Sequence, residues 1–194
     1  MGNQYIKYLI EILECTEIWQ RNRLGATHTG YDDGIRILVE EFTKHKINQS
    51  QLFFMGNGGS AAIASHMTAD YMKNGGMNTY SLYDNAVTTC MGNDYGYEYI
   101  FSRPMGFLVR EGDLVVAISS SGNSANIVNA IETARMKKAD VITFTGFEAG
   151  NKAKQLGDIN VYVPCKKYGI VESIHNLILQ QIVDLIMERD GVKL

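Results

Sequence analysis

The sequence predicts an α/β domain in which helices cover both faces of a parallel sheet. Short apolar runs alternate with longer amphipathic stretches through most of the chain, which is the pattern of strands joined by crossover helices. No internal repeat and no low-complexity segment interrupts this alternation. With 194 residues, 45% of them hydrophobic, the chain is long enough for one well-packed domain.

Two helices are expected to open the chain, before the alternation begins. Apolar residues recur at helical spacing from Tyr5 to Trp19 and again from Ile35 to Phe42. We expect these two helices to form a helical hairpin within residues 1–48, next to a ligand-binding domain formed by residues 49–194.

Four strand–helix pairs are expected to follow. The strands are Leu52–Met55, Asp113–Ile118, Val141–Phe144 and Ile159–Val163. The helices after them are Ser60–Lys73, Ser124–Lys137, Asn151–Leu156 and Val171–Glu188. A further strand is expected at Tyr80–Tyr83, and further helices at Ala86–Gly92 and Tyr99–Val109.

Charge and composition argue against several classes of protein. Lys and Arg total 18 against 21 Asp and Glu, without a long block of either sign, so no dedicated nucleic-acid surface is expected. The apolar runs are far shorter than the roughly 20 residues of a membrane-spanning helix, and the start of the chain lacks signal-peptide features. The widely spaced Cys15, Cys90 and Cys165 provide no disulfide framework. We therefore expect a cytoplasmic protein with neither a nucleic acid nor a membrane as partner.

Two polar loops lie where a predicted strand ends and a helix begins, which is where parallel sheets bind ligands. The first is Gly56-Asn57-Gly58-Gly59-Ser60. Its glycines let the backbone approach a ligand closely, and the helix start offers free N–H groups and the positive end of the helix dipole. A glycine-rich turn is as often only a turn, so this loop alone leaves both interpretations open.

The second loop, residues 119–124, has the sequence Ser-Ser-Ser-Gly-Asn-Ser. An N-cap needs only one of these hydroxyl groups, so their surplus at a helix start favours phosphate binding. Neither loop has the GK[ST] ending of a nucleotide P-loop or the dinucleotide-binding fingerprint. A small phosphorylated metabolite therefore fits better than ATP or NAD.

Four motifs together resemble the phosphoheptose isomerase branch of the sugar isomerase (SIS) domain superfamily. They are Gly56-Asn57-Gly58-Gly59-Ser60-Ala61-Ala62, Gly92-Asn93-Asp94-Tyr95-Gly96, Phe101-Ser102-Arg103 and Ile118-Ser119-Ser120-Ser121-Gly122-Asn123-Ser124. The resemblance runs from about Leu52 to about Ile186, and the opening helices also match. It implies a three-layer, doubly wound fold with a five-stranded parallel sheet. It also implies a homotetramer with active sites shared between subunits and with the opening helices at an oligomer interface.

The activity that the resemblance implies is an aldose–ketose isomerisation. Sedoheptulose 7-phosphate becomes D-glycero-D-manno-heptose 7-phosphate, usually with zinc, and the product supplies cell-surface polysaccharide. Sugar-phosphate binding is assigned by resemblance to Asn57, Gly58, Gly59, Ser60, Asn93, Asp94, Ser119, Ser120, Ser121 and Ser124. Without the resemblance, Asn93 and Asp94 are better explained as a polar turn that closes the preceding helix.

The metal positions depart from the family pattern. The resemblance places metal ligands at His66, Asp70, Glu172 and Gln180, where the family has His, Glu, Gln and His. His66 and Asp70, four residues apart, share one helix face, although such a pair is more often a local ion pair than a metal site. One nitrogen and three oxygen ligands are a harder set than zinc usually has. Manganese or magnesium therefore competes with zinc, and a site without metal also stays open.

The candidate catalytic residues are Asp70, Glu172 and Gln180. Asp70 is the first candidate for the base, because it occupies the family's Glu position, and Glu172 is the second. Gln180 cannot titrate, so the group best suited to proton transfer near neutral pH is missing there. Eight residues of helix rise about 12 Å, so Glu172 and Gln180 on one continuous helix cannot easily hold one ion. Either Glu172 lies in the preceding loop or two subunits contribute.

Two functions follow from these observations. The first is a phosphosugar isomerase, which is favoured by the retained phosphate loops and by His66 with an acid at position 70. The second is a non-catalytic SIS protein that senses a sugar phosphate or acts as a scaffold for a partner protein. The superfamily that the chain resembles includes such a scaffold, a homotetramer that associates with the replication initiator. The absence of His at position 180 favours this alternative.

Overall fold

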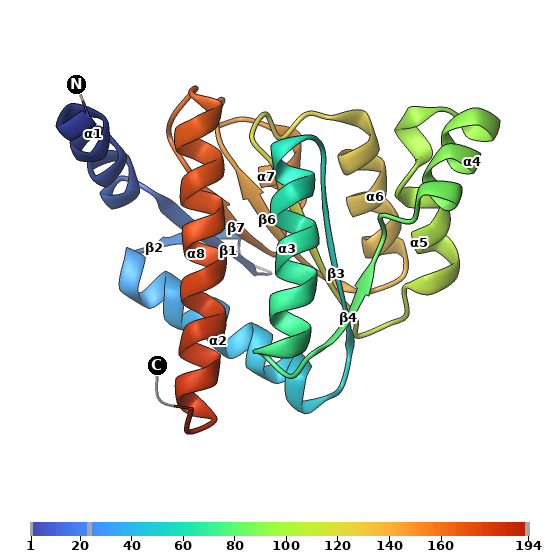
Figure 1. The fold of residues 1–194 in the computed structure, drawn as a ribbon, viewed down its shortest axis with the longest axis horizontal. Helices are drawn as coiled ribbons and strands as arrows, with labels where there is room; N and C mark the ends of the chain where they lie inside the picture. Colours follow the sequence, from blue (N-terminus) through green and yellow to red (C-terminus); the bar gives the residue numbers. More distant parts are fainter. Residues whose placement is uncertain (1, 23–24, 193–194) are drawn as a thin grey trace.

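A sheet with the strand order β2-β1-β7-β6-β5-β3-β4 runs through the computed structural model, which describes residues 2–22 and 25–192 (Figure 1). The parallel strands are β3 (Gln51–Gly56), β4 (Asn78–Ser81), β5 (Leu114–Ser119), β6 (Asp140–Thr145) and β7 (Ile159–Tyr162). β1 (Glu17–Asn22) and β2 (Gly25–Thr29) form an antiparallel hairpin beside β7. The predicted α/β class with five parallel strands is confirmed.

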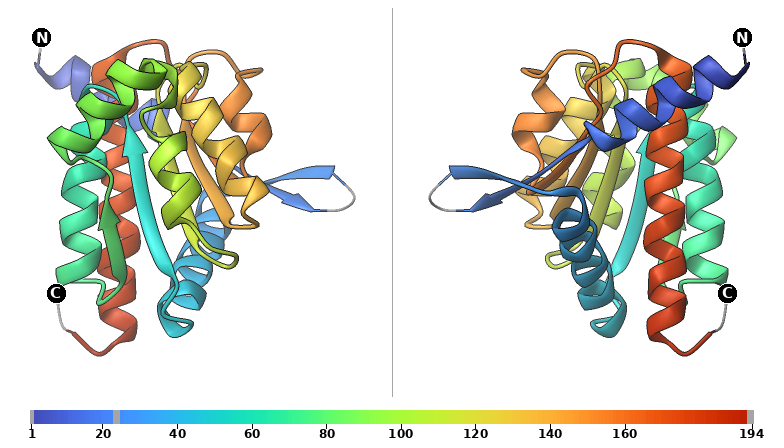
Figure 2. Two further views of the ribbon diagram at one scale, coloured as in Figure 1. Left: turned by 90° about the vertical axis from the view of Figure 1, so that its right-hand side faces the viewer. Right: turned by 90° about the vertical axis from the view of Figure 1, so that its left-hand side faces the viewer.

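Helices cover both faces of the sheet (Figures 1 and 2). One face carries α1 (Gly2–Glu14), α2 (Tyr31–Ile47), α3 (Gly59–Lys73) and α8 (Tyr168–Arg189). The other carries α4 (Asn85–Tyr95), the 3-10 turn η1 (Tyr97–Tyr99), α5 (Ser102–Leu108), α6 (Ala125–Met136) and α7 (Lys152–Leu156). Strand side chains alternate between two hydrophobic clusters: Leu52 and Phe54 face α2, α3 and α8, whereas Phe53 and Met55 face α5 and α6.

The opening of the chain differs from the predicted helical hairpin. α1 ends at Glu14, and the β-hairpin of β1 and β2 separates it from α2, so the expected helix from Tyr5 to Trp19 is too long. Thr16 and Ile18 are both buried, which is the two-residue period of a strand. Ile18 lies opposite Val161 in β7, so β1 covers a sheet edge that would otherwise expose unpaired backbone groups.

α8 meets the length and composition of a membrane-spanning helix, and within the described residues it alone does so. Half of the most apolar 18-residue stretch of this helix is buried in the fold. Ile174, Ile178 and Ile182 recur on its buried side, and the Tyr71 hydroxyl of α3 donates a hydrogen bond to the Leu179 carbonyl at 2.9 Å. The hydrophobicity of α8 is therefore used in packing against the sheet and α3.

His175 is a packing residue of α8. Its side chain is fully buried, its Nε2 lies 3.1 Å from the Thr145 carbonyl oxygen, and its ring packs edge-on against Phe144. Nδ1 has no hydrogen-bond partner within residues 2–22 and 25–192. Burial lowers the pKa of His175 to about 4, so the ring stays neutral at physiological pH.

We expect the free energy of unfolding to decrease as the pH falls from 6.5 towards 4. In this range the unfolded chain binds a proton at His175 that the folded chain does not bind, so stability is lost as the pH is lowered. The full shift corresponds to about 3 kcal/mol. Urea titrations between pH 7 and pH 4 measure the effect. The decrease should be smaller in His175→Asn than in the wild type. His28→Asn, which replaces an exposed histidine, is the control and should show the wild-type decrease. An equal dependence of the unfolding free energy on pH in both variants would contradict the assignment.

Candidate functional site

Both predicted loops border one cavity of about 480 Å³. β3 and β5 are parallel neighbours, with Gly56 opposite Ile118, so the loops that follow them meet at one end of the sheet. The cavity is lined by Asn57, Gly58, Gly59, Ser60, Ser119, Ser120, Ser121 and Ser124, together with Tyr168 and Glu172 of α8. Most of the residues predicted to bind the substrate are thus brought together.

The serine loop, residues 119–124, presents free donors to this cavity. The Ser120 hydroxyl is buried without a hydrogen-bond partner among the residues that the structure describes. Ser124 is the N-cap of α6, yet its side chain makes no capping hydrogen bond. Ser119 and Ser121 shape the loop instead, because their hydroxyl oxygens accept hydrogen bonds from the backbone N–H groups of residues 122 and 123. Free hydroxyl groups at the positive end of α6 suit an anion.

The turn of the serine loop requires glycine at position 122. Gly122 has a φ of 64°, which other residues rarely adopt, and a Cβ there would overlap the Asn151 side chain. Asn151 is held by three hydrogen bonds: its Oδ1 accepts from the Lys154 N–H at 2.9 Å, and its Nδ2 donates to the carbonyls of Glu148 at 2.8 Å and Gly146 at 3.3 Å. The side chain therefore has little freedom to move away.

Glu172 is the one carboxylate among the described residues that line the cavity. It follows Tyr168 by four residues, so both side chains lie on the same side of α8. The carboxylate lies against the start of α3, where a Cβ on Gly59 would be 2.6 Å from the Glu172 Cδ. Because Gly58, the N-cap of α3, provides no side-chain cap, the positive end of this helix faces the Glu172 carboxylate.

His66, Asp70 and Gln180 form a separate cluster where α3 packs beside α8. The Gln180 amide nitrogen donates to Asp70 Oδ2 at 2.6 Å and lies 3.1 Å from His66 Nε2. His66 Nε2 is 3.3 Å from the same Asp70 oxygen. At 1.5 Å per residue, Asp70 lies about 16 Å beyond Gly59 along α3. Within one chain, this cluster is therefore apart from the cavity.

The cluster provides part of a cation site. It offers an imidazole nitrogen and a carboxylate oxygen, which a divalent ion can use, whereas Gln180 turns the nitrogen of its amide towards both. Glu172 does not join it. α8 is continuous from Tyr168 to Arg189, so Glu172 lies inside the helix and eight residues before Gln180. One of the two alternatives from the sequence, that Glu172 precedes the helix, is wrong.

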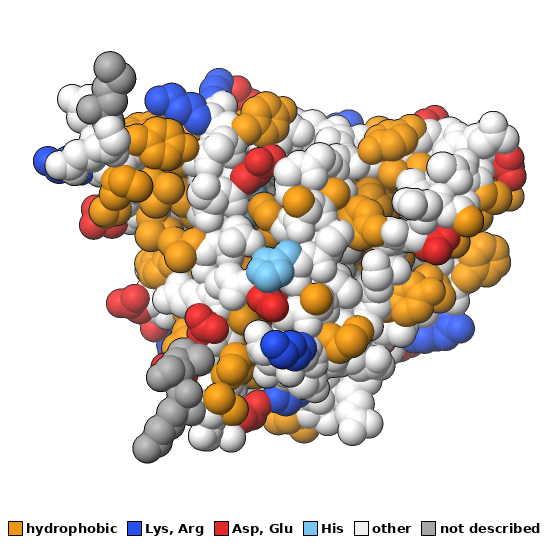
Figure 3. All heavy atoms as spheres, in the orientation of Figure 1, with side chains coloured by type: hydrophobic (Ala, Val, Ile, Leu, Met, Phe, Trp, Pro, Cys, Tyr) orange, Lys and Arg blue, Asp and Glu red, His pale blue; other side chains and the backbone are white. Residues whose placement is uncertain are grey.

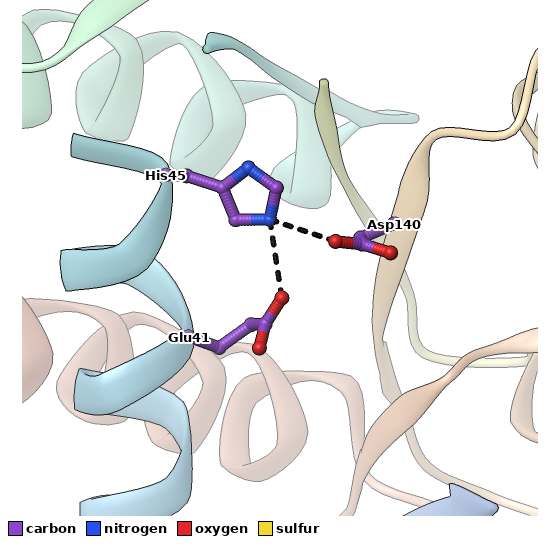
Figure 4. A group of neighbouring side chains, drawn as sticks. All are labelled: Glu41, His45 and Asp140. Carbon is purple, nitrogen blue, oxygen red and sulfur yellow. Dashed lines mark hydrogen bonds and ion pairs between the residues drawn. The ribbon is translucent and has the colours of Figure 1, made fainter. Parts of the chain in front are cut away.

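A second group with metal-ligand chemistry is shown in Figure 4. It lies near the opposite end of the sheet, because Asp140 is the first residue of β6. Glu41 and His45 of α2 and Asp140 of β6 hold their ligand atoms within 4.8 Å of one another. His45 Nε2 is 3.1 Å from Glu41 Oε1 and 3.1 Å from Asp140 Oδ2. Lys44 Nζ lies 2.7 and 2.8 Å from the same two oxygens.

This second group already contains a cation of its own. The Lys44 ammonium already meets both carboxylates, and the buried His45 Nδ1 has no partner in the described part of the chain. Metal-binding imidazoles usually donate their other N–H group to an acceptor, which is missing here. The hydrogen bond from His45, against the effect of burial, lowers the pKa of Asp140. We interpret the group as an ion-pair network that ties α2 to β6.

Asn93 and Asp94 do not line the cavity. They lie on the exposed side of α4, where Asn93 Nδ2 donates to Asp94 Oδ1 at 2.8 Å. Their assignment to the substrate stays a prediction. Sequence reasoning missed Tyr168, although its position four residues before Glu172 on a helix is a signal that could have found it.

Comparison with known proteins agrees with this geometry. The SIS domain family matches residues 21–146. The phosphoheptose isomerase of Buchnera aphidicola subsp. Acyrthosiphon pisum (strain Tuc7) is 40% identical over 152 residues, which cover 75% of this chain and 78% of that protein. The chain belongs to the phosphoheptose isomerase branch of the SIS domain family. The phosphoheptose isomerase of Enterobacter sp. (strain 638) is 42% identical over 144 residues, covering 71% and 74% of the two chains.

Solved structures place this SIS protein in the same branch. Phosphoheptose isomerase GmhA from Neisseria gonorrhoeae superposes with a TM-score of 0.74 at 32% identity, covering 81% of this chain and 85% of that one. A phosphoheptose isomerase from Francisella tularensis gives a TM-score of 0.73 at 28% identity, covering 79% and 85%. The family resemblance predicted from the four sequence motifs is confirmed.

We expect Gly122→Ala to lower the free energy of unfolding by about 2–4 kcal/mol, since it adds a steric overlap with Asn151 to backbone strain. Gly112→Ala is the matched control, because Gly112 also has a positive φ, of 84°, but a Cβ there meets nothing within 4 Å. The control should lose only about 1–2 kcal/mol. Chemical denaturation of both variants measures the difference, and equal losses would show that Asn151 moves aside.

Proposed function

We propose that this SIS protein converts sedoheptulose 7-phosphate into D-glycero-D-manno-heptose 7-phosphate. The observation that carries the proposal is the shared cavity, in which the free hydroxyl groups of the serine loop and the Glu172 carboxylate line the same space. Such a site offers phosphate binding at one position and proton transfer at another. The names of the relatives support the choice of substrate and product.

The phosphate is proposed to bind at the serine loop. Ser120 and Ser124 supply hydroxyl donors, and the N-terminus of α6 supplies backbone N–H groups. None of the described cavity-lining residues is Lys, Arg or His, so neutral donors and the helix dipole hold the phosphate charge. Gly58, Gly59 and Ser60 are proposed to contact the sugar, and Asn93 and Asp94 would reach it only after α4 moves or from another subunit.

Isomerisation requires a base that moves a proton between C1 and C2. In the ketose-to-aldose direction, the base removes a C1 proton. The C–H electron pair forms a C1–C2 double bond, and the carbonyl electrons move to O2, which gains a proton. O1 then loses its proton, and the base returns its own to C2, so atoms and electrons balance. Glu172 is proposed for this role within one chain because its carboxylate lines the cavity, whereas Asp70, the first candidate from the sequence, would reach the substrate only from a second subunit.

A divalent cation fits in part the donors of the cluster formed by His66, Asp70 and Gln180. His66 and Asp70 would hold it through one nitrogen and one oxygen, with zinc, manganese and magnesium as candidates. Gln180 would add a second oxygen only with its amide group reversed, because its nitrogen faces both residues. If a neighbouring subunit brought it next to the substrate, such an ion would polarise a carbonyl group. Gln180 is proposed to orient Asp70 and His66 through its amide and has no proton-transfer role of its own.

We also propose a cytoplasmic homotetramer with active sites shared between subunits. Figure 3 shows hydrophobic side chains interspersed with polar and charged ones on the face that α3 and α8 form. Met72 and Leu177 are exposed on these helices, and α1 exposes Tyr5, Ile6 and Ile10. Association of copies through these helices would cover this apolar surface. It would also bring the cluster of one subunit towards the cavity of another.

The activity is tested by incubating the purified protein with sedoheptulose 7-phosphate, with and without zinc or manganese, and following the aldose by NMR. We expect conversion, because the phosphate loop and a carboxylate are in place. Binding of the sugar phosphate without conversion under any of these conditions would instead favour the non-catalytic sensor or scaffold.

Two isosteric variants test the assignment of the base. Glu172→Gln places the usual family residue at this position and removes the carboxylate; we expect kcat to fall by about 10²–10⁴-fold with substrate affinity within a few-fold of wild type. Asp70→Asn should retain more activity, because Asp70 lies outside the cavity of its own chain. Loss of turnover in Asp70→Asn alone would return the role of base to Asp70, acting across a subunit boundary.

A further inference from the structure

Asn57 and Asn126 form a reciprocal amide pair that bridges the two loops. Asn57 Nδ2 donates to Asn126 Oδ1 at 2.9 Å, and Asn126 Nδ2 donates to Asn57 Oδ1 at 2.8 Å. Asn57 belongs to the first glycine loop, and Asn126 is the second residue of α6, directly after the serine loop. Two side chains that are 69 positions apart in the sequence thus join the two walls of the cavity.

Further hydrogen bonds occupy the oxygens of this pair. Asn57 Oδ1 also accepts from the Tyr97 hydroxyl at 3.1 Å, and Asn126 Oδ1 accepts from the Ile127 N–H at 3.0 Å. A carbonyl oxygen accepts about two hydrogen bonds, so both side-chain oxygens are saturated. Asn57 retains one side-chain N–H, and Asn126 is only 2% exposed. A sugar hydroxyl therefore finds no acceptor on the Asn57 side chain.

We infer that Asn126 is a positioning residue of the phosphosugar site and that Asn57 serves as its partner in a link between the loops. This inference rests on the proposed phosphosugar function and changes the role of Asn57, which sequence resemblance assigns to substrate binding. The link fixes Gly58 and Gly59 relative to the serine loop before the ligand enters. Binding then requires less ordering of the loops, which raises affinity.

Tyr97 extends the link to a third segment. It lies in η1, between α4 and α5, and its side chain is largely exposed, with its hydroxyl group hydrogen-bonded to Asn57. The Tyr97 hydroxyl group thus connects the segment that follows α4 to the first loop by a hydrogen bond. Because one oxygen of Asn57 serves both Tyr97 and Asn126, loss of Asn57 removes both connections at once.

A link of this kind has a distinctive energetic signature. When either amide is removed, its partner is left with unpaired groups, so the second removal costs little more than the first. A side chain that instead contacts the substrate directly contributes independently of Asn126. The coupling between the two positions therefore separates a link from a ligand.

A double-mutant cycle on Asn57→Ala and Asn126→Ala tests the inference, with dissociation constants of sedoheptulose 7-phosphate measured by calorimetry. We expect each single variant to weaken binding about ten-fold and the double variant to be no weaker than either. Binding of inorganic phosphate, which needs only the serine loop, should change less than about two-fold. General destabilisation would not produce this selectivity. Additive losses, or a loss in Asn57→Ala with none in Asn126→Ala, would overturn the inference.

Tyr97→Phe, combined with Asn57→Ala, provides a second double-mutant cycle. Because Tyr97 is 61% exposed, this substitution leaves no empty space in the hydrophobic core. It removes one hydroxyl group and should weaken sedoheptulose 7-phosphate binding about two- to three-fold in the wild-type background, with no effect in Asn57→Ala. An equal effect in both backgrounds would overturn the link to Tyr97. If the wild type binds glucose 6-phosphate but not sedoheptulose 7-phosphate, the proposed substrate fails, and the same cycles with glucose 6-phosphate still decide the role of Asn126.

Discussion

The adjacency of β3 and β5 in the parallel sheet is the constraint on which the site depends. Their register, with Leu52 opposite Leu114 and Gly56 opposite Ile118, ends both strands at the same level. The glycine loop and the serine loop therefore face each other, although some sixty residues of chain separate them. Alternating burial of the strand side chains on two faces holds this register, since a slip by one residue would exchange the two hydrophobic clusters. The amide pair of Asn57 and Asn126 then fixes the finer separation of the loops.

Local pattern was sufficient to predict the parallel strands and the two loops, because a strand period and a glycine or serine cluster are both properties of adjacent residues. It failed for β1. The apolar spacing from Tyr5 fits a helix up to Glu14, and nothing local marks the change to a strand at Glu17. That change depends on pairing with β7, which lies about 140 residues later in the chain. Such a pairing is an edge-covering interaction that no sequence window contains.

In the candidate site, too, some features could be predicted from the local sequence and others could not. The surplus of hydroxyl groups predicted the serine loop. Helix rise indicated that Glu172 and Gln180 cannot easily hold one ion from one continuous helix, and α8 is continuous over both residues. The resemblance grouped four positions as one metal set, and one chain brings His66, Asp70 and Gln180 together while Glu172 stands in the cavity. Asn126 could not be found from the sequence, because an asparagine in the first turn of a helix is unremarkable until its partner is known.

Glu172 also makes the two helix N-termini at the site, those of α3 and α6, different for an anion. The starts of α3 and α6 both lack a side-chain cap, so each is an anion site in principle. The Glu172 carboxylate, admitted by the missing side chain of Gly59, occupies the start of α3 and repels a second anion there. The start of α6, with the free hydroxyls of Ser120 and Ser124, then remains as the proposed position of the phosphate. A glutamine at position 172 would leave both helix ends open. In the proposed function, the charge of Glu172 therefore orients a phosphosugar with its carbonyl end towards the proposed base.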